Sequence, residues 1–451
     1  MTLSMTLNQI AGIVGVAADF AEISVRGAVI DSRKIEAGNL FIALKGERVD
    51  GHDYLAKARE AGATAALVSE LRDDVLPQIL VSDVKRAFGL IAHAWLKQCR
   101  AKVVAITGSN GKTSLKEMIG AILKQVGPVT STQGNYNNDL GVPLTVCRVD
   151  REDKFAVIEM GTNHPGEIAE LVKIAVPDVA VINNIAPAHI EGFGSELGVA
   201  REKGQIYAGL AQTGVAVVNA DMPYADIWAP LIAKRRVVRF GLESEADITA
   251  DYVQLDPATG HFMVAIEGIQ HHFSLPLPGL HNINNALAAI AVCRALSVPV
   301  DAMVRGLGSM KAVPHRLQLR QGVAESRLLD DTYNANPGSY LQALKTLAGF
   351  AGEHWLVLGD FGELGPDSDA IHKKMGDQAR EYGITRLFTV GESSQMAAQQ
   401  FGEQAEHFQD IDTLKHSLQD ALHKDVTCLI KGSRFMQLDK LADQLAAEGE
   451  S

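Results

Sequence analysis

Short apolar runs alternate with segments of helical periodicity along the chain, and the alternation is clearest after residue 101. β-branched runs at residues 103–107, 155–160, 179–184 and 215–219 are each followed by polar residues or glycine. Apolar residues recur three and four positions apart after the first of these runs, as they do along one face of a helix. This pattern predicts a parallel sheet whose strands are connected by crossover helices.

The pattern changes on either side of this central region. The region before residue 101 has short strand candidates at residues 28–32, 40–44 and 65–68. A second α/β alternation follows residue 313, with strand candidates at residues 327–330, 355–358, 386–390 and 427–431. Antiparallel strands are predicted at residues 248–275, with a turn at Thr259-Gly260. We therefore predict an α/β protein with domains at residues 1–100, 101–313 and 314–451, because 451 residues exceed one ordinary core.

Composition and charge exclude several classes of protein. The formal charge of −12 argues against a nucleic-acid partner, which needs a basic face on the protein. Apolar runs are too short to span a bilayer, and the N-terminus lacks the features of a secretion signal. The four cysteines lie far apart and are typical of a reducing compartment. We expect a cytoplasmic protein, inserted in no membrane, that functions as a monomer.

A glycine-rich turn joins the first strand of the central region to a helix. The turn consists of Gly108, Ser109, Asn110, Gly111, Lys112, Thr113 and Ser114. Backbone N–H groups at such a turn and the positive end of the helix dipole together form an anion site. Lys112 can reach the outer phosphates of a nucleotide, and the Thr113 hydroxyl can bind Mg²⁺. Ile106 stands where the general pattern has a further glycine, so the loop is a shortened form.

Polar residues follow the next two strands of the central region. Glu159 ends the strand at residues 155–160, at the sheet edge where ligands bind, and can hold Mg²⁺ beside Thr113. A carboxylate that ends a strand can equally form a surface ion pair. His189 lies in the loop after the strand at residues 179–184, and Lys203 lies on the following helix. By itself His189 is as compatible with a structural role, and Lys203 with an exposed helix lysine.

In chain order, these residues and three later motifs resemble the Mur ligase family. The later motifs are residues 280–289, which include Asn282 and Asn285, then Pro314-His315-Arg316, and residues 330–337, which include Asp331. The resemblance covers essentially the whole chain. It implies a small N-terminal α/β nucleotide-sugar domain, a central P-loop-type parallel-sheet ATPase domain and a C-terminal Rossmann-like α/β domain.

The resemblance also implies roles for individual residues. Catalysis would involve Lys112, His189, Lys203 and Arg316. ATP would be bound by the glycine-rich loop and by Asn282, Asn285, Arg316 and Asp331. Two Mg²⁺ ions would be held, one by Thr113 and Glu159, the other by His189 and a carbamylated Lys203. Substrate contacts would come from Ser32, Arg33 and Asn137 or Asn138.

Further motifs indicate which reaction of the family to expect. Residues 31–41 resemble the uridine-nucleotide domain of its later-acting members, while residues 331–337, 358–365 and 431–434 resemble the members that add D-alanyl-D-alanine. The implied reaction joins D-alanyl-D-alanine to UDP-N-acetylmuramoyl-tripeptide through an acyl phosphate, at the expense of ATP. This is the last cytoplasmic peptide addition in peptidoglycan synthesis, with diaminopimelate or lysine as the third peptide residue.

Three other functions share parts of this pattern. A folylpolyglutamate synthase would have the same phosphate loop and metal positions, but it needs no uridine-nucleotide domain. An ordinary P-loop kinase or NTPase would leave Asn282, Arg316 and Asp331 without a role. A non-catalytic nucleotide-binding module would have no need of Lys112, Thr113 and Glu159 together.

Overall fold

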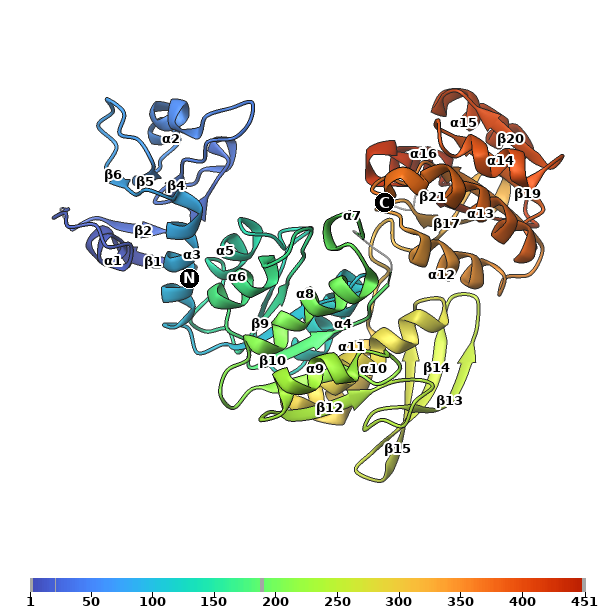
Figure 1. Ribbon diagram of the computed structural model, residues 1–451, viewed down its shortest axis with the longest axis horizontal. Coiled ribbons are helices and arrows are strands. Elements are labelled where there is room, and N and C mark those ends of the chain that lie inside the picture. The colour runs from blue at the N-terminus through green and yellow to red at the C-terminus, as the bar shows by residue number, and fades with distance from the viewer. Residues whose placement is uncertain (1–2, 21, 187–189, 448–451) are drawn as a thin grey trace.

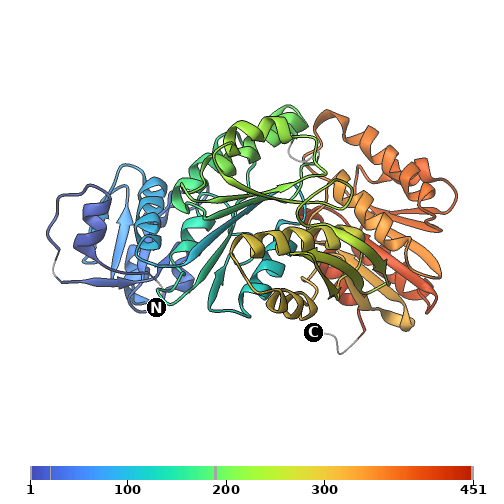
Figure 2. The same ribbon diagram turned by 90° about the horizontal axis from the view of Figure 1, so that it is seen from below.

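The computed structural model describes residues 3–20, 22–186 and 190–447 of the chain. The chain forms three successive parts, and its N-terminal and C-terminal parts lie at opposite ends of the central part (Figure 1). The view from below shows the same order along the molecule (Figure 2). Each part contains a mainly parallel sheet with helices packed on it, which confirms the predicted α/β class.

The N-terminal part contains a small parallel sheet in the order β3-β4-β5-β6. Its strands are β3 (Ala28–Val29), β4 (Leu40–Ile42), β5 (Ala65–Val68) and β6 (Gln78–Leu80), beside an antiparallel pair of β1 (Ser4–Thr6) and β2 (Ser24–Arg26). Its helices are α1 (Leu7–Ile13), η1 (Ser32–Lys34), η2 (Gly51–Tyr54), α2 (Leu55–Glu60) and α3 (Val84–Leu96). The predicted strands match β3, β4 and β5. The sequence did not predict β1, β2 and β6, because each is short and includes polar residues, so it lacks the apolar run that marks β4.

Helix α3 packs the N-terminal part firmly onto the central part. One continuous hydrophobic core runs from Leu3 to Trp228 and includes the inner face of α3. Trp95 on α3 is fully buried, and its indole nitrogen donates a hydrogen bond to the Val149 carbonyl at 2.9 Å. Because the two parts share one core, their relative orientation is fixed by packing rather than by a linker.

The central part contains a six-stranded parallel sheet in the order β12-β11-β10-β7-β9-β8. Its strands are β7 (Lys102–Thr107), β8 (Val129–Ser131), β9 (Phe155–Glu159), β10 (Val179–Ile182), β11 (Val215–Asn219) and β12 (Arg236–Phe240). Its helices are α4 (Lys112–Leu123), α5 (Gly141–Val146), α6 (Glu167–Ile174), α7 (Ile190–Phe193), α8 (Glu196–Ala208), α9 (Ala225–Ile232), α10 (Leu280–Ala295) and α11 (Val300–Gly308). All four predicted strands are present. The later strands β9 and β10 lie on opposite sides of β7, so the carboxyl end of β7 is the position where ligands bind in such sheets.

An antiparallel sheet is inserted between β12 and α10, as predicted. It consists of β13 (Ala250–Leu255), β14 (Gly260–Ile266) and β15 (Ile269–Leu275). The turn predicted at Thr259-Gly260 lies slightly earlier, at residues 256–259, and Gly260 already begins β14. A second turn at Glu267 and Gly268 was not predicted, and both residues have positive φ angles, of 55° and 79°. Two such residues form the tight turn that suits the twist of a hairpin.

The C-terminal part contains a second six-stranded sheet in the order β16-β17-β21-β18-β19-β20, in which only the pairing of β16 is antiparallel. Its strands are β16 (Gln318–Gln321), β17 (Arg327–Asp331), β18 (Glu353–Gly359), β19 (Arg386–Val390), β20 (Ala405–Phe408) and β21 (Val426–Lys431). Its helices are η3 (Val323–Glu325), α12 (Pro337–Leu347), η4 (Gly365–Asp367), α13 (Ser368–Glu381), α14 (Gln395–Phe401), α15 (Ile411–Ala421), η5 (Arg434–Met436) and α16 (Leu438–Leu445). Its two hydrophobic cores begin at Leu317 and include no residue of the central sheet. The C-terminal part is therefore packed independently, unlike the N-terminal part.

Candidate active site

The glycine-rich loop lies at the carboxyl end of β7 and leads directly into α4. Gly108 and Gly111 have φ angles of 154° and 72°, which only glycine adopts readily. Gly111 is the N-cap of α4, so the free N–H groups of the first helical turn face the loop. This is the strand, turn and helix N-terminus that the sequence predicted for a phosphate site.

Two asparagines at the end of β10 hold the loop in shape, although sequence analysis did not select them. Asn183 and Asn184 both donate hydrogen bonds to the Asn110 carbonyl, at 3.0 and 2.9 Å. The Asn184 side chain also accepts from the Asn110 N–H at 2.8 Å, and Asn183 donates to Asn285 at 2.7 Å. These contacts link the loop to α10. The only sequence signal was their position at the end of a buried strand.

This packing makes Gly111 a sensitive position. A Cβ atom there would lie 2.8 Å from the amide nitrogen of Asn183 and 2.9 Å from the amide oxygen of Asn285. We expect Gly111→Ala to lower kcat for ATP-dependent phosphate release by about 10²-fold, because a shift of the loop misplaces the reacting groups. Gly120→Ala on the same helix is the matched control, since its Cβ would meet only Ser131 at 3.4 Å. Equal activity of both variants would contradict this account of the loop.

Glu159 and Thr113 are brought together as predicted. The Thr113 hydroxyl donates to the Glu159 carboxylate at 3.1 Å, and the Asn137 side chain donates to its other oxygen at 2.8 Å. Glu159 is 2% exposed and Thr113 8% exposed. A buried carboxylate beside a hydroxyl is a set of oxygen donors that suits Mg²⁺. The chemistry of these residues therefore fits the metal that the resemblance implies.

A buried lysine that the sequence did not indicate is linked to Glu159 through Thr132. Lys116 on α4 is 1% exposed and donates to the Thr132 carbonyl at 2.7 Å. The Thr132 hydroxyl in turn accepts the N–H of Glu159 at 2.9 Å. In the sequence, Lys116 is one of several polar residues on an amphipathic helix, so no local pattern distinguishes it.

Asn137 and Asn138 differ in their surroundings. Asn137 contacts Glu159, whereas the Asn138 side chain accepts the N–H groups of Gly141 and Leu140 at 2.9 and 3.3 Å. Of the two, Asn137 is therefore the one whose side chain lies at the Glu159 carboxylate, and Asn138 stabilises the start of α5.

Two buried lysines give the site its charge. Lys112 donates to the carbonyls of Gly108 and Ser109 at 2.7 and 3.4 Å, and burial lowers the pKa of its amine. Lys203 on α8 is 1% exposed. Burial, followed by the positive charge of Lys112, lowers the pKa of Lys203 to about 7. The lowered pKa values mean that burial disfavours the charged amines, and an anionic ligand nearby would favour them again.

The loop that carries His189 lies outside the described residues, so its predicted metal role stays a prediction. Glu202, next to Lys203, accepts the N–H groups of Gly166 and Ile168 at 2.8 and 2.9 Å. Its carboxylate thus stabilises the start of α6.

Asn282, which is predicted to meet adenine, and Asn285, which is predicted to lie nearby, are on the first two turns of α10. Asn282 donates to the Pro278 carbonyl at 2.8 Å, and Asn285 donates to the Asn282 side chain at 3.3 Å. Through Asn183, Asn285 is also connected to the phosphate loop. Neighbouring His281 is half-buried, and desolvation lowers its pKa to about 4, so its imidazole is neutral at neutral pH.

The C-terminal part reaches the same site. The Arg316 guanidinium stacks 3.9 Å from the centre of the Tyr333 ring, and Asp331 forms an ion pair with buried Lys431. Asn336, the N-cap of α12, donates to the Asn110 side chain of the phosphate loop at 2.7 Å. The structure therefore places residues of the C-terminal part at the loop, although the two parts have separate cores.

Ser32 and Arg33 lie in η1 of the N-terminal part. Arg33 is 78% exposed and forms two hydrogen bonds to Asp31, at 2.9 and 2.8 Å. These hydrogen bonds lower the pKa of Asp31 to about 2. Asp31 orients the Arg33 guanidinium, and most of the Arg33 side chain stays exposed to solvent. Its predicted contact with the substrate stays a prediction.

Three family models match the chain. They are the Mur ligase family catalytic domain over residues 24–108, the Mur ligase middle domain over residues 106–293, and the Mur ligase glutamate ligase domain over residues 315–434. A UDP-N-acetylmuramoyl-tripeptide–D-alanyl-D-alanine ligase of Escherichia coli is 43% identical over 99% of both chains. The chain belongs to the Mur ligase family. The Mur ligase fold of three domains is thereby confirmed.

Solved Mur ligase structures agree with this membership. A crystal structure of MurF from Acinetobacter baumannii superposes with a TM-score of 0.91 at 33% identity, covering 98% of this chain and 99% of that one. The structure of a MurF ligase from Thermotoga maritima in complex with ADP superposes with a TM-score of 0.85 at 27% identity, covering 93% of this chain and 97% of that one. The predicted resemblance to D-alanyl-D-alanine-adding members is confirmed by these matches.

Proposed function

We propose that the protein is an ATP-dependent ligase that joins D-alanyl-D-alanine to UDP-N-acetylmuramoyl-tripeptide, forming ADP and phosphate. The observation that carries the proposal is the cluster of Lys112, Thr113 and Glu159 at the phosphate loop. It is supported by full-length relatives whose names state this reaction. A folylpolyglutamate synthase of Mycobacterium tuberculosis is 17% identical to the chain, which supports a shared fold and not that reaction.

In the proposed reaction, the terminal carboxylate of the tripeptide attacks the γ-phosphate of ATP and gives an acyl phosphate and ADP. The amine of D-alanyl-D-alanine then attacks the acyl carbon, and phosphate leaves from the tetrahedral intermediate. Installing phosphate first is necessary because a carboxylate is a poor acylating agent. Phosphoryl transfer depends on positioning and on neutralising charge, more than on covalent help from the protein.

Named side chains would supply these functions. Lys112 would turn from the loop carbonyls to the transferring phosphate, and Arg316 would approach it from the C-terminal part. Thr113 and Glu159 would hold Mg²⁺, and a second ion would be held by His189 and carbamylated Lys203. Bound Mg²⁺ would neutralise phosphate charge and orient ATP. Asn282 would contact adenine, with Asn285 nearby, and Asp331 would contact the ribose. Ser32, Arg33 and Asn137 would contact the nucleotide-sugar substrate.

We also propose the domain limits 1–100, 101–313 and 314–451, with the third domain closing over ATP. None of the described helices is long and apolar enough to cross a bilayer. A cytoplasmic location is proposed, supported by four buried cysteines that are all free. We also propose that the protein functions as a monomer.

The test measures phosphate release from ATP and Mg²⁺ with UDP-N-acetylmuramoyl-tripeptide, with and without D-alanyl-D-alanine, together with the product mass. The tripeptide is supplied in its diaminopimelate and lysine forms. Release that requires both substrates, and a product heavier by the dipeptide residue, is the expected result. Release supported by a folate and glutamate would mean that the enzyme acts on a different substrate. Release independent of any amine would overturn the ligase reaction.

A further inference from the structure

Two adjacent aspartates end strand β17, and only Asp331 has been given a role so far. Because successive side chains of a strand point to opposite faces, the two carboxylates have different surroundings. Asp331 pairs with Lys431, whereas the Asp330 side chain is fully buried on the other side. A buried carboxylate needs strong partners, so the contacts of Asp330 indicate what it does.

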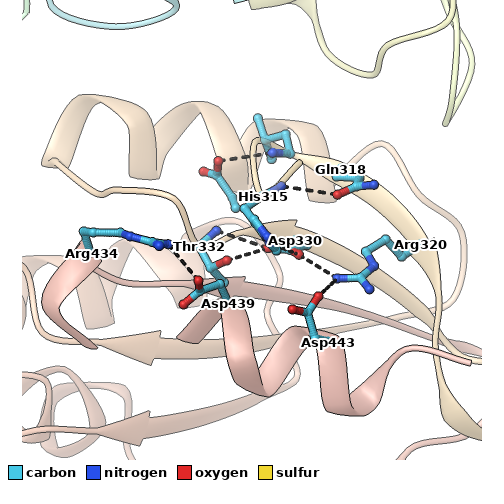
Figure 3. A network of polar contacts seen from close by, with 10 residues as sticks. His315, Gln318, Arg320, Asp330, Thr332, Arg434, Asp439 and Asp443 are labelled. Atoms are coloured by element: carbon cyan, nitrogen blue, oxygen red, sulfur yellow. Dashed lines mark hydrogen bonds and ion pairs between the residues drawn. The ribbon is translucent and has the colours of Figure 1, made fainter. Parts of the chain in front are cut away.

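Asp330 binds His315 in the segment that connects the central and C-terminal parts (the connecting segment, residues 309–317) and Arg320 in strand β16, which follows it. One carboxylate oxygen contacts His315 Nδ1 at 2.9 Å and the Arg320 guanidinium at 3.0 Å. The other accepts from the Thr332 hydroxyl at 2.7 Å. Figure 3 shows His315 and Arg320 meeting at Asp330, with Asp443 of α16 contacting the same end of the Arg320 guanidinium. Asp330 thus ties the connecting segment to the strand.

The connecting segment has an unfavourable backbone at this point. His315 and Leu317 have φ angles of 61° and 47°, in the left-handed region that most residues avoid. Such a conformation persists only when surrounding contacts enforce it. Further hydrogen bonds join the segment to the strand end: Tyr333 N–H to the His315 carbonyl at 3.0 Å, and Leu317 N–H to Asp331 at 3.2 Å.

Arg316 lies between these two residues. The double left-handed turn directs its guanidinium onto the Tyr333 ring, 3.9 Å from the ring centre. Relaxation at His315 or Leu317 would change where this side chain points. The orientation of Arg316 therefore depends on the contacts that hold its two neighbours.

His315, Asp330 and Asp443 also lie close enough to suggest a cation site. The Arg320 guanidinium already stands between the two carboxylates, at 3.0 Å from Asp330 and 2.7 Å from Asp443. Its positive charge takes the place that a metal ion would need. The cluster is therefore a polar support rather than a metal centre.

We propose that Asp330 is a positioning residue that fixes the connecting segment, and with it Arg316, for phosphoryl transfer. Its catalytic consequence rests on the proposed function, whereas the structural tie does not. Replacing Asp330 by Asn removes the negative charge that His315 and Arg320 share at one oxygen. It also turns an amide NH₂ either against these two donors or against the Thr332 hydroxyl and N–H. Asp443→Asn is the matched control, because it removes the other carboxylate from Arg320 without touching the segment.

Two measurements test the proposal. We expect Asp330→Asn to lower kcat at least tenfold with KM for the nucleotide-sugar substrate within about twofold, and Asp443→Asn to retain kcat within about twofold. In an Arg316→Met background, Asp330→Asn should lower kcat no further, since the positioned group is gone. An equal loss in both backgrounds would show a general structural role and overturn the proposal.

Limited trypsin digestion tests, without any enzyme assay, whether Asp330 holds the connecting segment in place. Mass spectrometry would follow cleavage of the Arg316–Leu317 bond, which should be at least tenfold faster in Asp330→Asn than in the wild type or Asp443→Asn. Unchanged cleavage would overturn the proposal, while absence of ligation by the wild type would overturn only the proposed function. His315→Asn serves if Asp330→Asn does not fold, because Asn tolerates the left-handed backbone but is too short to reach Asp330.

Discussion

Lys112→Met is expected to lower kcat of the ligase reaction by about 10³-fold, or about 4 kcal/mol of transition-state stabilisation. The Lys112 amine is buried at the phosphate loop and donates to the carbonyls of Gly108 and Ser109. With ATP bound, this amine would move to the transferring phosphate, where its positive charge would neutralise the negative charge of the phosphate. The neutral backbone amides of the loop cannot supply that positive charge. Methionine preserves the length and apolar stem of the side chain, so the loss is one of charge.

The measurement is steady-state phosphate release with both substrates, beside thermal unfolding of each variant. Lys124→Met is the control, because Lys124 follows the same helix and is exposed. An unfolding midpoint close to that of the wild type would assign the loss to chemistry. Activity of Lys112→Met within tenfold of the wild type would mean that the loop binds nucleotide without using this lysine.

The second large effect is expected at Lys203. Lys203→Ala should lose at least about 10²-fold in kcat, because it removes a proposed ligand of the second metal site. Only an unprotonated amine reacts with carbon dioxide to form a carbamate. A pKa of about 7, lowered mainly by burial, leaves roughly half of the amine unprotonated at pH 7. An exposed lysine, with its pKa near 10.4, would be almost wholly protonated there.

The direction of the pH dependence follows from this pKa. As pH falls below about 7, the Lys203 amine becomes protonated, so carbamate content and activity should fall together. Carbon-13 NMR with labelled bicarbonate would detect the carbamate in the wild type and in Lys234→Ala, which changes an exposed lysine. Full activity of Lys203→Ala at low bicarbonate would refute the proposed role.

Much of the site could be predicted because its central element is local in sequence. Residues 108–114 form a continuous turn between one strand and one helix, so their spacing alone indicates a phosphate site. Glu159 could be placed beside Thr113 because parallel strands deliver their carboxyl ends to one edge of a sheet. The family resemblance then added residues of the C-terminal part that no spacing connects to the loop.

The supporting residues could not be predicted in this way. Asn183 contacts Asn110 and Asn285, which are 73 and 102 positions away in the chain. Lys116 and Asp330 are ordinary polar residues in the sequence, and only their burial and partners reveal their importance. Pairs so distant in sequence leave no periodic pattern, because their proximity results from packing of the whole fold.

The sequence by itself determined the α/β class, the succession of three regions, the phosphate loop and the family to which the chain belongs. Those features depend on local spacing of apolar, glycine and charged residues, which sets backbone conformation over short distances. Tertiary structure decided that the N-terminal part shares a core with the central part, while the C-terminal part does not. It also decided that Asp330 holds the connecting segment, since a buried carboxylate takes its function from the partners that folding brings to it.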